Sequence, residues 1–143
     1  MQARTVTSSF RPCIVMGGVI YPLAGSSVVG RWHSGCPSSE CMSKGFRQPP
    51  QIPIVDSYCF ISRHHARLQL DSSMDCWLED LRSLNGTAIF HSGHRARAQK
   101  MPYVERLVPG MRYRLWDGDI LALGYQEHKD PYFVASYHKY GRW

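Results

Sequence analysis

The sequence predicts an all-β fold, either a sandwich or a barrel. Along its 143 residues, short runs of β-branched, aromatic and aliphatic residues recur between clusters of Gly, Pro, Ser and Asp. The apolar residues do not repeat with the helical period of about 3.6 residues. Hydrophobic residues make up 43% of the chain and charged residues 20%, a balance that is typical of one globular domain with its own core.

The expected strands alternate with turn-forming residues. Gly17-Gly18 predicts a hairpin, and the polar segment Asp71–Asp75 joins two strands that should pair. The run Ala66–Leu70 alternates apolar and polar residues, so one of its faces should be buried. We interpret Asp117-Gly118-Asp119 as another hairpin turn. The expected strands are Cys13–Met16, Val19–Leu23, Ser27–Arg31, Ala66–Leu70, Cys76–Asp80, Thr87–Phe90, Tyr113–Trp116, Ile120–Leu123 and Tyr132–Tyr137. The expected core residues include Trp77, Leu78, Leu115, Ile120 and Leu123.

Two longer segments interrupt the strand pattern and are predicted to be mobile surface loops. Residues 32–53 are rich in Ser, Gly, Pro and Cys, and residues 91–102 carry several His, Arg and Lys with little apolar content. The domain is expected to span residues 11–138. A flexible N-terminus over residues 1–10 should precede it, and a C-terminal tail over residues 139–143 should follow it.

The composition favours an intracellular protein, nuclear or cytoplasmic, that does not act at a membrane. No apolar run approaches the ~20 residues of a membrane helix, and the polar start of the chain leads into no signal-peptide stretch. The 5 cysteines are scattered over unlike contexts, which does not fit a disulfide framework, so we expect reduced thiols. The formal net charge of +6 attracts anions such as nucleic acid, acidic lipid or phosphorylated protein. Charge alone does not choose among these partners.

Four short motifs occur in order along the chain, each near an expected strand end. They are Gly30-Arg31, Ser62-Arg63-His64-His65-Ala66, Asp80-Leu81-Arg82-Ser83-Leu84-Asn85-Gly86-Thr87, and Asp117-Gly118-Asp119-Ile120 followed by Leu123-Gly124. In this order they resemble the forkhead-associated (FHA) domain, and the resemblance covers about residues 12–136. It implies an FHA-type β-sandwich of two mostly antiparallel sheets, with loop insertions at 32–53 and 91–102. It also implies a signalling module that binds phosphothreonine on a partner protein.

The resemblance assigns the phosphopeptide-binding residues to loops at one end of the sandwich. Arg31 would be the main phosphate ligand, because a guanidinium binds two phosphate oxygens at once. Ser62 would contact the phosphate through its hydroxyl, and Arg63 would add a second cationic contact. Asn85 would hold the peptide backbone through its amide. Many family members have Thr or Ser where this chain has Leu84, so only the Leu84 backbone amide is expected to contribute, and a side-chain donor worth about 1 kcal/mol is missing.

Other motif residues have implied structural roles. Gly30, Gly86 and Thr87 shape the loops, and His65 is expected to be an internal buttress rather than a phosphate ligand. His64 should face solvent. Phe60 lies in the loop where the family often selects the third residue after phosphothreonine, and an aromatic residue there suggests an apolar preference. The basic side chains of Arg95 and Arg97 would favour acidic residues elsewhere along the ligand.

Other functions receive less support from the sequence. No nucleophile elbow, zinc helix, phosphate-binding loop or dinucleotide-binding turn is present, so neither an enzyme nor a small-molecule substrate is expected. No cofactor and no metal are expected either, since the spacing of Cys36 and Cys41 with His33 does not match common zinc sites. Nucleic-acid binding is disfavoured because the basic run at 91–100 lacks interleaved aromatic residues. A phosphate-independent assembly domain is kept as an alternative because of Leu84.

Overall fold

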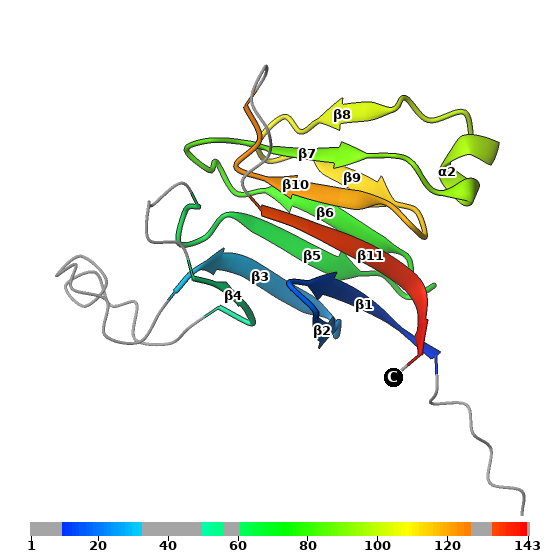
Figure 1. Cartoon of the computed structure of the whole chain (residues 1–143), viewed down its shortest axis with the longest axis horizontal. Coiled ribbons are helices and arrows are strands. Elements are labelled where there is room, and N and C mark those ends of the chain that lie inside the picture. Colours follow the sequence, from blue (N-terminus) through cyan, green and yellow to red (C-terminus); the bar gives the residue numbers. More distant parts are fainter. Residues whose placement is uncertain (1–9, 33–49, 56–60, 127–132, 143) are drawn as a thin grey trace, which may run out of the picture.

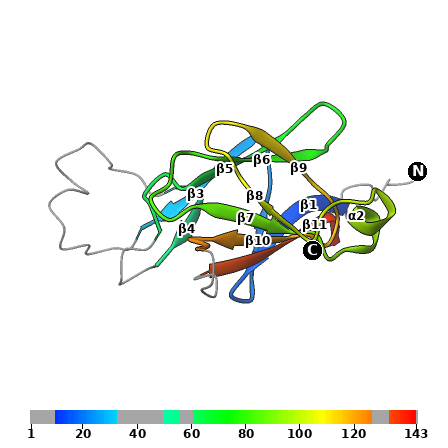
Figure 2. The same cartoon turned by 90° about the horizontal axis from the view of Figure 1, so that it is seen from above.

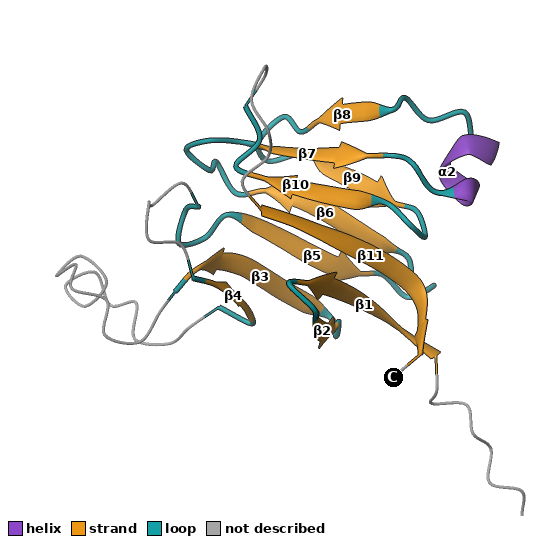
Figure 3. Cartoon of the chain, viewed as in Figure 1, coloured by secondary structure: helices purple, strands orange, loops and turns teal. Residues whose placement is uncertain are grey.

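The protein is an almost entirely β structure of two stacked sheets (Figure 1). The computed structural model describes residues 10–32, 50–55, 61–126 and 133–142. The strands are β1 Phe10–Met16, β2 Val19–Pro22, β3 Ser26–Arg31, β4 Ile52–Ile54, β5 Ala66–Leu70, β6 Cys76–Asp80, β7 Thr87–Phe90, β8 Val104–Arg106, β9 Arg112–Leu115, β10 Ile120–Leu123 and β11 Phe133–Arg142. One short helix, α2 (His94–Ala98), is present in the described residues (Figure 3).

The two sheets pack face to face, as the view from above shows (Figure 2). One sheet has the strand order β2-β1-β11-β10-β7-β8, and the other has the order β4-β3-β5-β6-β9. Among the described strands, β3 and β4 pair in parallel, and the remaining pairs are antiparallel. The predicted sandwich of two mostly antiparallel sheets is therefore confirmed.

The core follows from the alternation of side chains along the strands. In β5, Ala66 and Leu68 are buried while Gln69 between Leu68 and Leu70 is exposed, because successive strand residues point to opposite faces. Expected core residues Leu78, Leu115 and Leu123 are buried in the cluster between the sheets. Trp77 and Ile120 are half-buried instead. Each of them neighbours a core leucine in its strand, so its own side chain faces the outer side of its sheet.

The hairpins at Gly17-Gly18 and at Asp71–Asp75 are confirmed, but the hairpin predicted at Asp117-Gly118-Asp119 is wrong. β1 and β2 pair directly across the two glycines, which have φ angles of 58° and 80°. In contrast, the turn at Asp117-Gly118-Asp119 connects β9 in one sheet to β10 in the other. β9 pairs with β6 and β10 pairs with β7 and β11, so this turn carries the chain across the sandwich. The Asp-Gly-Asp residues indicate that the chain reverses direction, but they do not indicate which sheet the next strand joins.

Several elements were not expected from the sequence. β4 begins inside the segment 32–53, and its run Ile52-Pro53-Ile54 lies at a sheet edge, where proline is tolerated. Residues 33–49 lie outside the described part of the chain. At the other end, β11 continues to Arg142 by pairing with β1. The strand therefore includes residues that the sequence interpretation assigned to a C-terminal tail over 139–143.

The segment 91–102 packs against the sandwich, which its polar composition did not indicate. His91 is buried, and its two ring nitrogens lie 2.9 Å from Asp119 Oδ2 and 2.8 Å from Glu105 Oε1. Ala96 of α2 is also buried. The imidazole thus joins the start of this segment to the β9–β10 turn and to β8, so residues 91–102 have a defined place on the fold.

Candidate functional site

The ends of β3, β4, β6 and β10 and the starts of β5, β7 and β11 lie at one end of the sandwich, which we call the loop end (Figure 1). The connections that adjoin these strand ends are β3–β4, β4–β5, β6–β7 and β10–β11. The described residues of these connections include the sequence-predicted binding residues other than Phe60. Arg31 ends β3, and Ser62 precedes β5 by a few residues. Leu84 and Asn85 lie between β6 and β7. Antiparallel pairing and the crossing between sheets therefore bring distant motifs to the same end.

Backbone contacts hold Arg31 beside Ser62. The Arg31 amide donates to the Ser62 carbonyl over 3.0 Å. Gly30 makes this approach possible, since a Cβ built on it would lie 1.7 Å from the Arg63 carbonyl oxygen. No larger residue fits at Gly30 without a shift of the backbone. The Arg31 Nε atom is buried and has no hydrogen-bond partner among the residues that the structure describes.

The hydroxyl of Ser62 connects two loops of the loop end. The Leu84 amide donates to Ser62 Oγ over 3.0 Å, while the Leu84 side chain is 81% exposed. We expected this amide to be available for a ligand, and the structure instead engages it with Ser62. A hydroxyl that accepts this bond keeps its own proton for donation to another acceptor. The bond thus orients Ser62 Oγ at the surface of the loop end.

His65 lies beneath these loops and is fully buried. The Ser62 amide donates to its Nδ1 over 3.1 Å, and its Nε2 lies 2.9 Å from the Gly86 carbonyl oxygen. Because Nδ1 accepts, the ring proton belongs on Nε2, which then donates to Gly86. Burial lowers the pKa of His65, and the hydrogen bond to Gly86 and the charge of Asp80 oppose this only in part. A neutral imidazole therefore joins the β4–β5 and β6–β7 connections from inside.

A buried carboxylate organises the β6–β7 connection, and sequence analysis gave it no role. Asp80 Oδ1 accepts from Ser83 Oγ and from Thr87 Oγ1, both over 2.6 Å. Asp80 Oδ2 accepts from the Ser83 amide over 3.0 Å, and the Gly86 amide donates to Ser83 Oγ over 3.0 Å. The Ser83 hydroxyl therefore donates to Asp80 and accepts from Gly86, so it is held inside the β6–β7 connection. The spacing Asp-x-x-Ser, which places Ser83 three residues after Asp80, could have indicated these hydrogen bonds.

Asn85 also has a partner that the sequence did not indicate. Gln126 Nε2 donates to Asn85 Oδ1 over 2.7 Å, which fixes the orientation of the Asn85 amide toward the β10–β11 connection. Next to it, Gly86 adopts a φ of 90°, a conformation that glycine allows without steric cost. Asn85 and Gln126 line a groove of about 320 Å³ together with Leu84, Arg106 and Tyr125.

The profile of the FHA domain family matches residues 47–124. This chain belongs to the FHA domain family. The match includes the β4–β5 and β6–β7 connections and both motifs that contain Ser62 and Asn85. No curated protein sequence matches the chain.

Solved FHA structures share this fold at low sequence identity. A structure from a study of phosphothreonine-dependent FHA domain interactions has 21% identity and a TM-score of 0.53, over 89% of this chain and 94% of that chain. The FHA domain of an Arabidopsis thaliana hypothetical protein has 19% identity and a TM-score of 0.60, over 99% and 95%. The N-terminal FHA domain of S. cerevisiae Rad53p, solved with a phosphothreonine peptide, has 14% identity and a TM-score of 0.58, over 90% and 93%.

The remaining predicted residues of this FHA domain differ in how they are placed. Arg63 is half-buried and follows Ser62 directly, and Thr87 is buried on Asp80. His64 is exposed, as expected. Phe60 lies outside the described residues, so its predicted role in ligand selection stays a prediction.

Three further features concern metal binding, thiols and membranes. Among the described residues, no group of three or more His, Cys, Asp or Glu side chains could hold a metal ion. His33, Cys36 and Cys41 lie outside those ranges. Cys13 and Cys76 are buried as free thiols. No helix in the described ranges has the length and apolar character needed to cross a bilayer.

Proposed function

We propose that this FHA domain binds a phosphothreonine-containing segment of a partner protein at its loop end and catalyses no reaction. The observation that carries this proposal is the hydrogen-bonded cluster of Arg31, Ser62 and Leu84, which joins three loops at one surface. A protein with this activity needs no cofactor, metal or small-molecule substrate. It would act as a signalling module in the nucleus or the cytoplasm, away from membranes.

The donors at the loop end suit a phosphate monoester. A phosphothreonine carries about −1.5 to −2 charges and three strong acceptor oxygens. The guanidinium of Arg31 would bind two of these oxygens, and its buried Nε without a partner among the described residues is a donor that a ligand would satisfy. Ser62 Oγ, oriented by the Leu84 amide, would donate its proton to the third oxygen. Hydrogen bonds to charged groups are worth about 1.5–3 kcal/mol each.

The peptide beside the phosphate would be held by residues of the β6–β7 connection. Asn85 is oriented by Gln126, and we propose that its amide binds the peptide backbone. Arg63 would add positive charge near the phosphate. Phe60 would select an apolar residue after the phosphothreonine. Gly30, His65, Gly86 and Thr87 would support the loops without touching the ligand.

The solved relatives support the proposal in general terms. The Rad53p domain was solved with a phosphothreonine peptide, and a mycobacterial EmbR structure contains a phosphopeptide. An enzyme would need a nucleophile aimed at the phosphorus atom. The Arg31 amide donates to the Ser62 carbonyl, and the Ser62 hydroxyl accepts from the Leu84 amide. We therefore expect the side chains of Arg31 and Ser62 to hold the phosphate and not to attack it.

The test is a comparison of phosphorylated and unmodified peptides. A phosphothreonine peptide library first selects a sequence, and calorimetry then measures its affinity in phosphothreonine, phosphoserine and unmodified forms. We expect binding of the phosphothreonine form, weaker binding of the phosphoserine form, and a loss of about a hundredfold with Arg31→Ala, equal to about two charged hydrogen bonds after partial compensation by water. Arg112→Ala removes an equally charged, exposed side chain from β9 and should leave the affinity unchanged.

Two other experimental results would each indicate a different function. Equal affinity for modified and unmodified peptides would indicate phosphate-independent assembly, for which the exposed Leu84 side chain would be the natural contact. Diffuse binding of oligonucleotides that falls steeply with salt would indicate a nucleic-acid-binding domain.

A further inference from the structure

A second group of basic and aromatic side chains lies at the end of the sandwich opposite the loop end. It lines a pocket of about 80 Å³, which we call the distal pocket. The pocket is built from α2, from the end of β9 with the following turn, and from the C-terminal half of β11. Its lining includes Arg95, Arg114, Trp116, Asp117, Lys139 and Tyr140.

Close backbone packing brings α2 to this end. A Cβ built on Gly93 would lie 2.3 Å from the Asp117 carbonyl oxygen, and Gly118 Cα lies 3.2 Å from the same position. A glycine just before α2 therefore lets the helix approach the β9–β10 turn. As a result, Arg95 of the basic segment meets Trp116 and the end of β11 in one pocket. The sequence lacked aromatic residues within the basic run, and the fold supplies them from elsewhere.

Two donor atoms of residues that line the distal pocket are buried and have no acceptor in the described part of the chain. These are Arg114 Nε and Trp116 Nε1. The Arg114 guanidinium lies 4.0 Å over the Trp116 ring, and its Nη2 atom lies 3.1 Å from Asp75 Oδ1. Buried donors without an acceptor are costly. A pocket of this size has room for a small polar group, so an acceptor-bearing ligand would satisfy both.

The charges around the distal pocket favour a singly charged ligand. Arg95, Arg114 and Lys139 supply three positive charges, and Asp75 and Asp117 supply two negative charges. The net excess of one positive charge attracts an anion. Because the cost of removing an ion from water rises with the square of its charge, so small an excess favours a carboxylate over a doubly charged phosphate. The Trp116 face that Arg114 covers cannot also stack on a nucleic-acid base.

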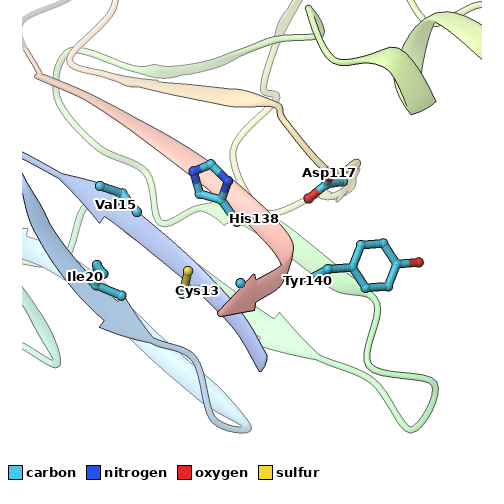
Figure 4. Close-up of a pocket in the computed structure, with 7 residues that line it drawn as sticks. Cys13, Val15, Ile20, Asp117, His138 and Tyr140 are labelled. Carbon is cyan, nitrogen blue, oxygen red and sulfur yellow. The ribbon is translucent and has the colours of Figure 1, made fainter. Parts of the chain in front are cut away.

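A groove with both polar and apolar lining continues from the distal pocket across the outer face of the six-stranded sheet. This outer groove has a volume of about 340 Å³ and shares Asp117 and Tyr140 with the distal pocket. Figure 4 shows Val15 on β1 and Ile20 on β2 along it, with Asp117 and Tyr140 at one end. Ile20 is 45% exposed. The groove thus offers apolar surface directly beside the positive pocket.

The thiol of Cys13 lies in the outer groove and is not an activated nucleophile. Burial, and then the charge of Asp117, raise the pKa of Cys13 above its ordinary value. His138 lies beside Cys13 in the strand register, but its Nε2 is hydrogen-bonded to Ser136 Oγ at 2.8 Å. A protonated thiol behaves as a small apolar side chain, so the groove is a contact surface.

We propose that the distal pocket and the outer groove form a second docking surface of this FHA domain. It binds a protein segment in which a carboxylate side chain enters the distal pocket and an adjacent apolar side chain lies in the outer groove. This binding requires no phosphorylation and is independent of the proposed function of the loop end. With both surfaces, one domain holds two protein segments at opposite ends.

The test uses short acetylated dipeptide amides as probes and the Trp116 indole N–H as the reporter. In ¹⁵N-labelled protein, Trp116→Phe identifies this signal. Titration with acetyl-Asp-Leu-amide should shift it saturably. Replacing Asp by Asn, or Leu by Ser, in the probe should weaken binding. Arg95→Gln should weaken binding about tenfold, whereas Arg97→Gln, an exposed arginine on the same helix outside the pocket lining, should change it less than about twofold. Arg31→Ala should have no effect.

Several results would overturn the proposal. These are the absence of a saturable shift, equal binding of the Asn and Asp dipeptides, and equal effects of Arg95→Gln and Arg97→Gln. Stronger competition by inorganic phosphate than by acetate would assign the pocket to phosphate. Saturation by an oligothymidylate at lower concentration than the dipeptide would assign it to nucleic acid. A loss of dipeptide binding in Arg31→Ala would show that the two ends are not independent.

Discussion

The backbone amide of Leu84 donates to the hydroxyl of Ser62 over 3.0 Å, across 22 positions of sequence. The same serine is fixed from below by His65, whose Nδ1 accepts from the Ser62 amide. Its carbonyl accepts from the Arg31 amide. Every polar group of Ser62 therefore has a partner, two of these partners lie on other loops or strands, and only the hydroxyl proton is left to face a ligand. Ser62 thus makes hydrogen bonds to the end of β3, to His65 within its own connection and to the β6–β7 connection.

Replacing Ser62 by alanine should reduce phosphopeptide affinity more than stability. The variant loses the proposed hydroxyl donor to the phosphate, which we expect to lower affinity about tenfold to a hundredfold. It also leaves the exposed Leu84 amide to bond with water, so unfolding should become easier by about 1 kcal/mol or less. Calorimetry and urea unfolding measure the two effects. Ser73→Ala, in an exposed turn, is the control, and an equal loss of affinity in it would contradict the assignment.

The buried His65 should make stability depend on pH below its ordinary pKa of 6.5. Burial lowers the pKa of His65 in the folded protein, so as the pH falls below 6.5 the unfolded chain takes up the proton first. The stability that neutral His65 provides is complete above this value and is lost as the pH falls through the folded pKa. Protonation would also place a hydrogen on Nδ1, which faces the Ser62 amide.

The measurement is urea unfolding of the wild type and His65→Gln from about pH 7.5 to about pH 5, a range that covers the ordinary histidine pKa. The difference in unfolding free energy between the two proteins should shrink as the pH falls. His64→Gln replaces the exposed neighbour and should follow the wild type at every pH. A constant difference between the wild type and His65→Gln would show that His65 does not titrate in this range.

Asp80 should be essential for the β6–β7 connection. Its carboxylate accepts three hydrogen bonds from Ser83 and Thr87, and an asparagine amide offers a single acceptor oxygen. Asp80→Asn should therefore lower the free energy of unfolding by about 2 kcal/mol and weaken peptide binding through the loop. Glu79→Gln is the matched control on the same strand. Glu79 makes a long ion pair of 3.6 Å with Arg67, which should contribute less than about 0.5 kcal/mol.

Gly30 should tolerate no side chain. In Gly30→Ala the new Cβ would lie 1.7 Å from the Arg63 carbonyl oxygen, so β3 and the β4–β5 connection must separate. We expect a loss of about 2–3 kcal/mol in the free energy of unfolding, as for overpacked cores, together with weaker phosphopeptide binding. Thermal unfolding measures the first and calorimetry the second. Unchanged stability would mean that the close approach of these two segments is not present in solution.

The strands that sequence analysis found are those with a clear local signal. Ala66–Leu70 alternates apolar and polar residues, and Ala66 and Leu68 are buried, so a period of two was sufficient there. Cys76–Asp80 was expected to pair with it across the polar turn Asp71–Asp75, and the two strands do pair. β4 and β8 have three residues each, which is too short for any period to be visible. α2 has five residues and no side-chain cap, so no capping residue marked its start. These elements exist because the surrounding sheets provide their pairing and packing.

At the loop end, too, local sequence motifs indicated some residues, while contacts between distant residues could not be predicted. Motif order indicated Arg31, Ser62 and Asn85, and the structure brings their loops to one end. The partners of these residues could not be predicted, because Gln126 bonds to Asn85 from 41 positions away and carries no motif. The engagement of the Leu84 amide by Ser62 is likewise a tertiary contact. The sequence therefore predicted candidate residues whose loops lie together, but it did not predict the contacts that orient them.

Leu84 provides a test in which binding should improve. Its side chain is 81% exposed, so a change there alters the binding surface with little effect on the core. Leu84→Thr restores the hydroxyl that many family members carry at this position. The hydroxyl should add one hydrogen bond to the phosphate, worth about 1 kcal/mol, or a gain of about fivefold in affinity for a phosphothreonine peptide. Leu84→Val has nearly the same shape without the hydroxyl and should bind as the wild type does. Equal affinities of the Thr and Val variants would show that this position does not face the phosphate.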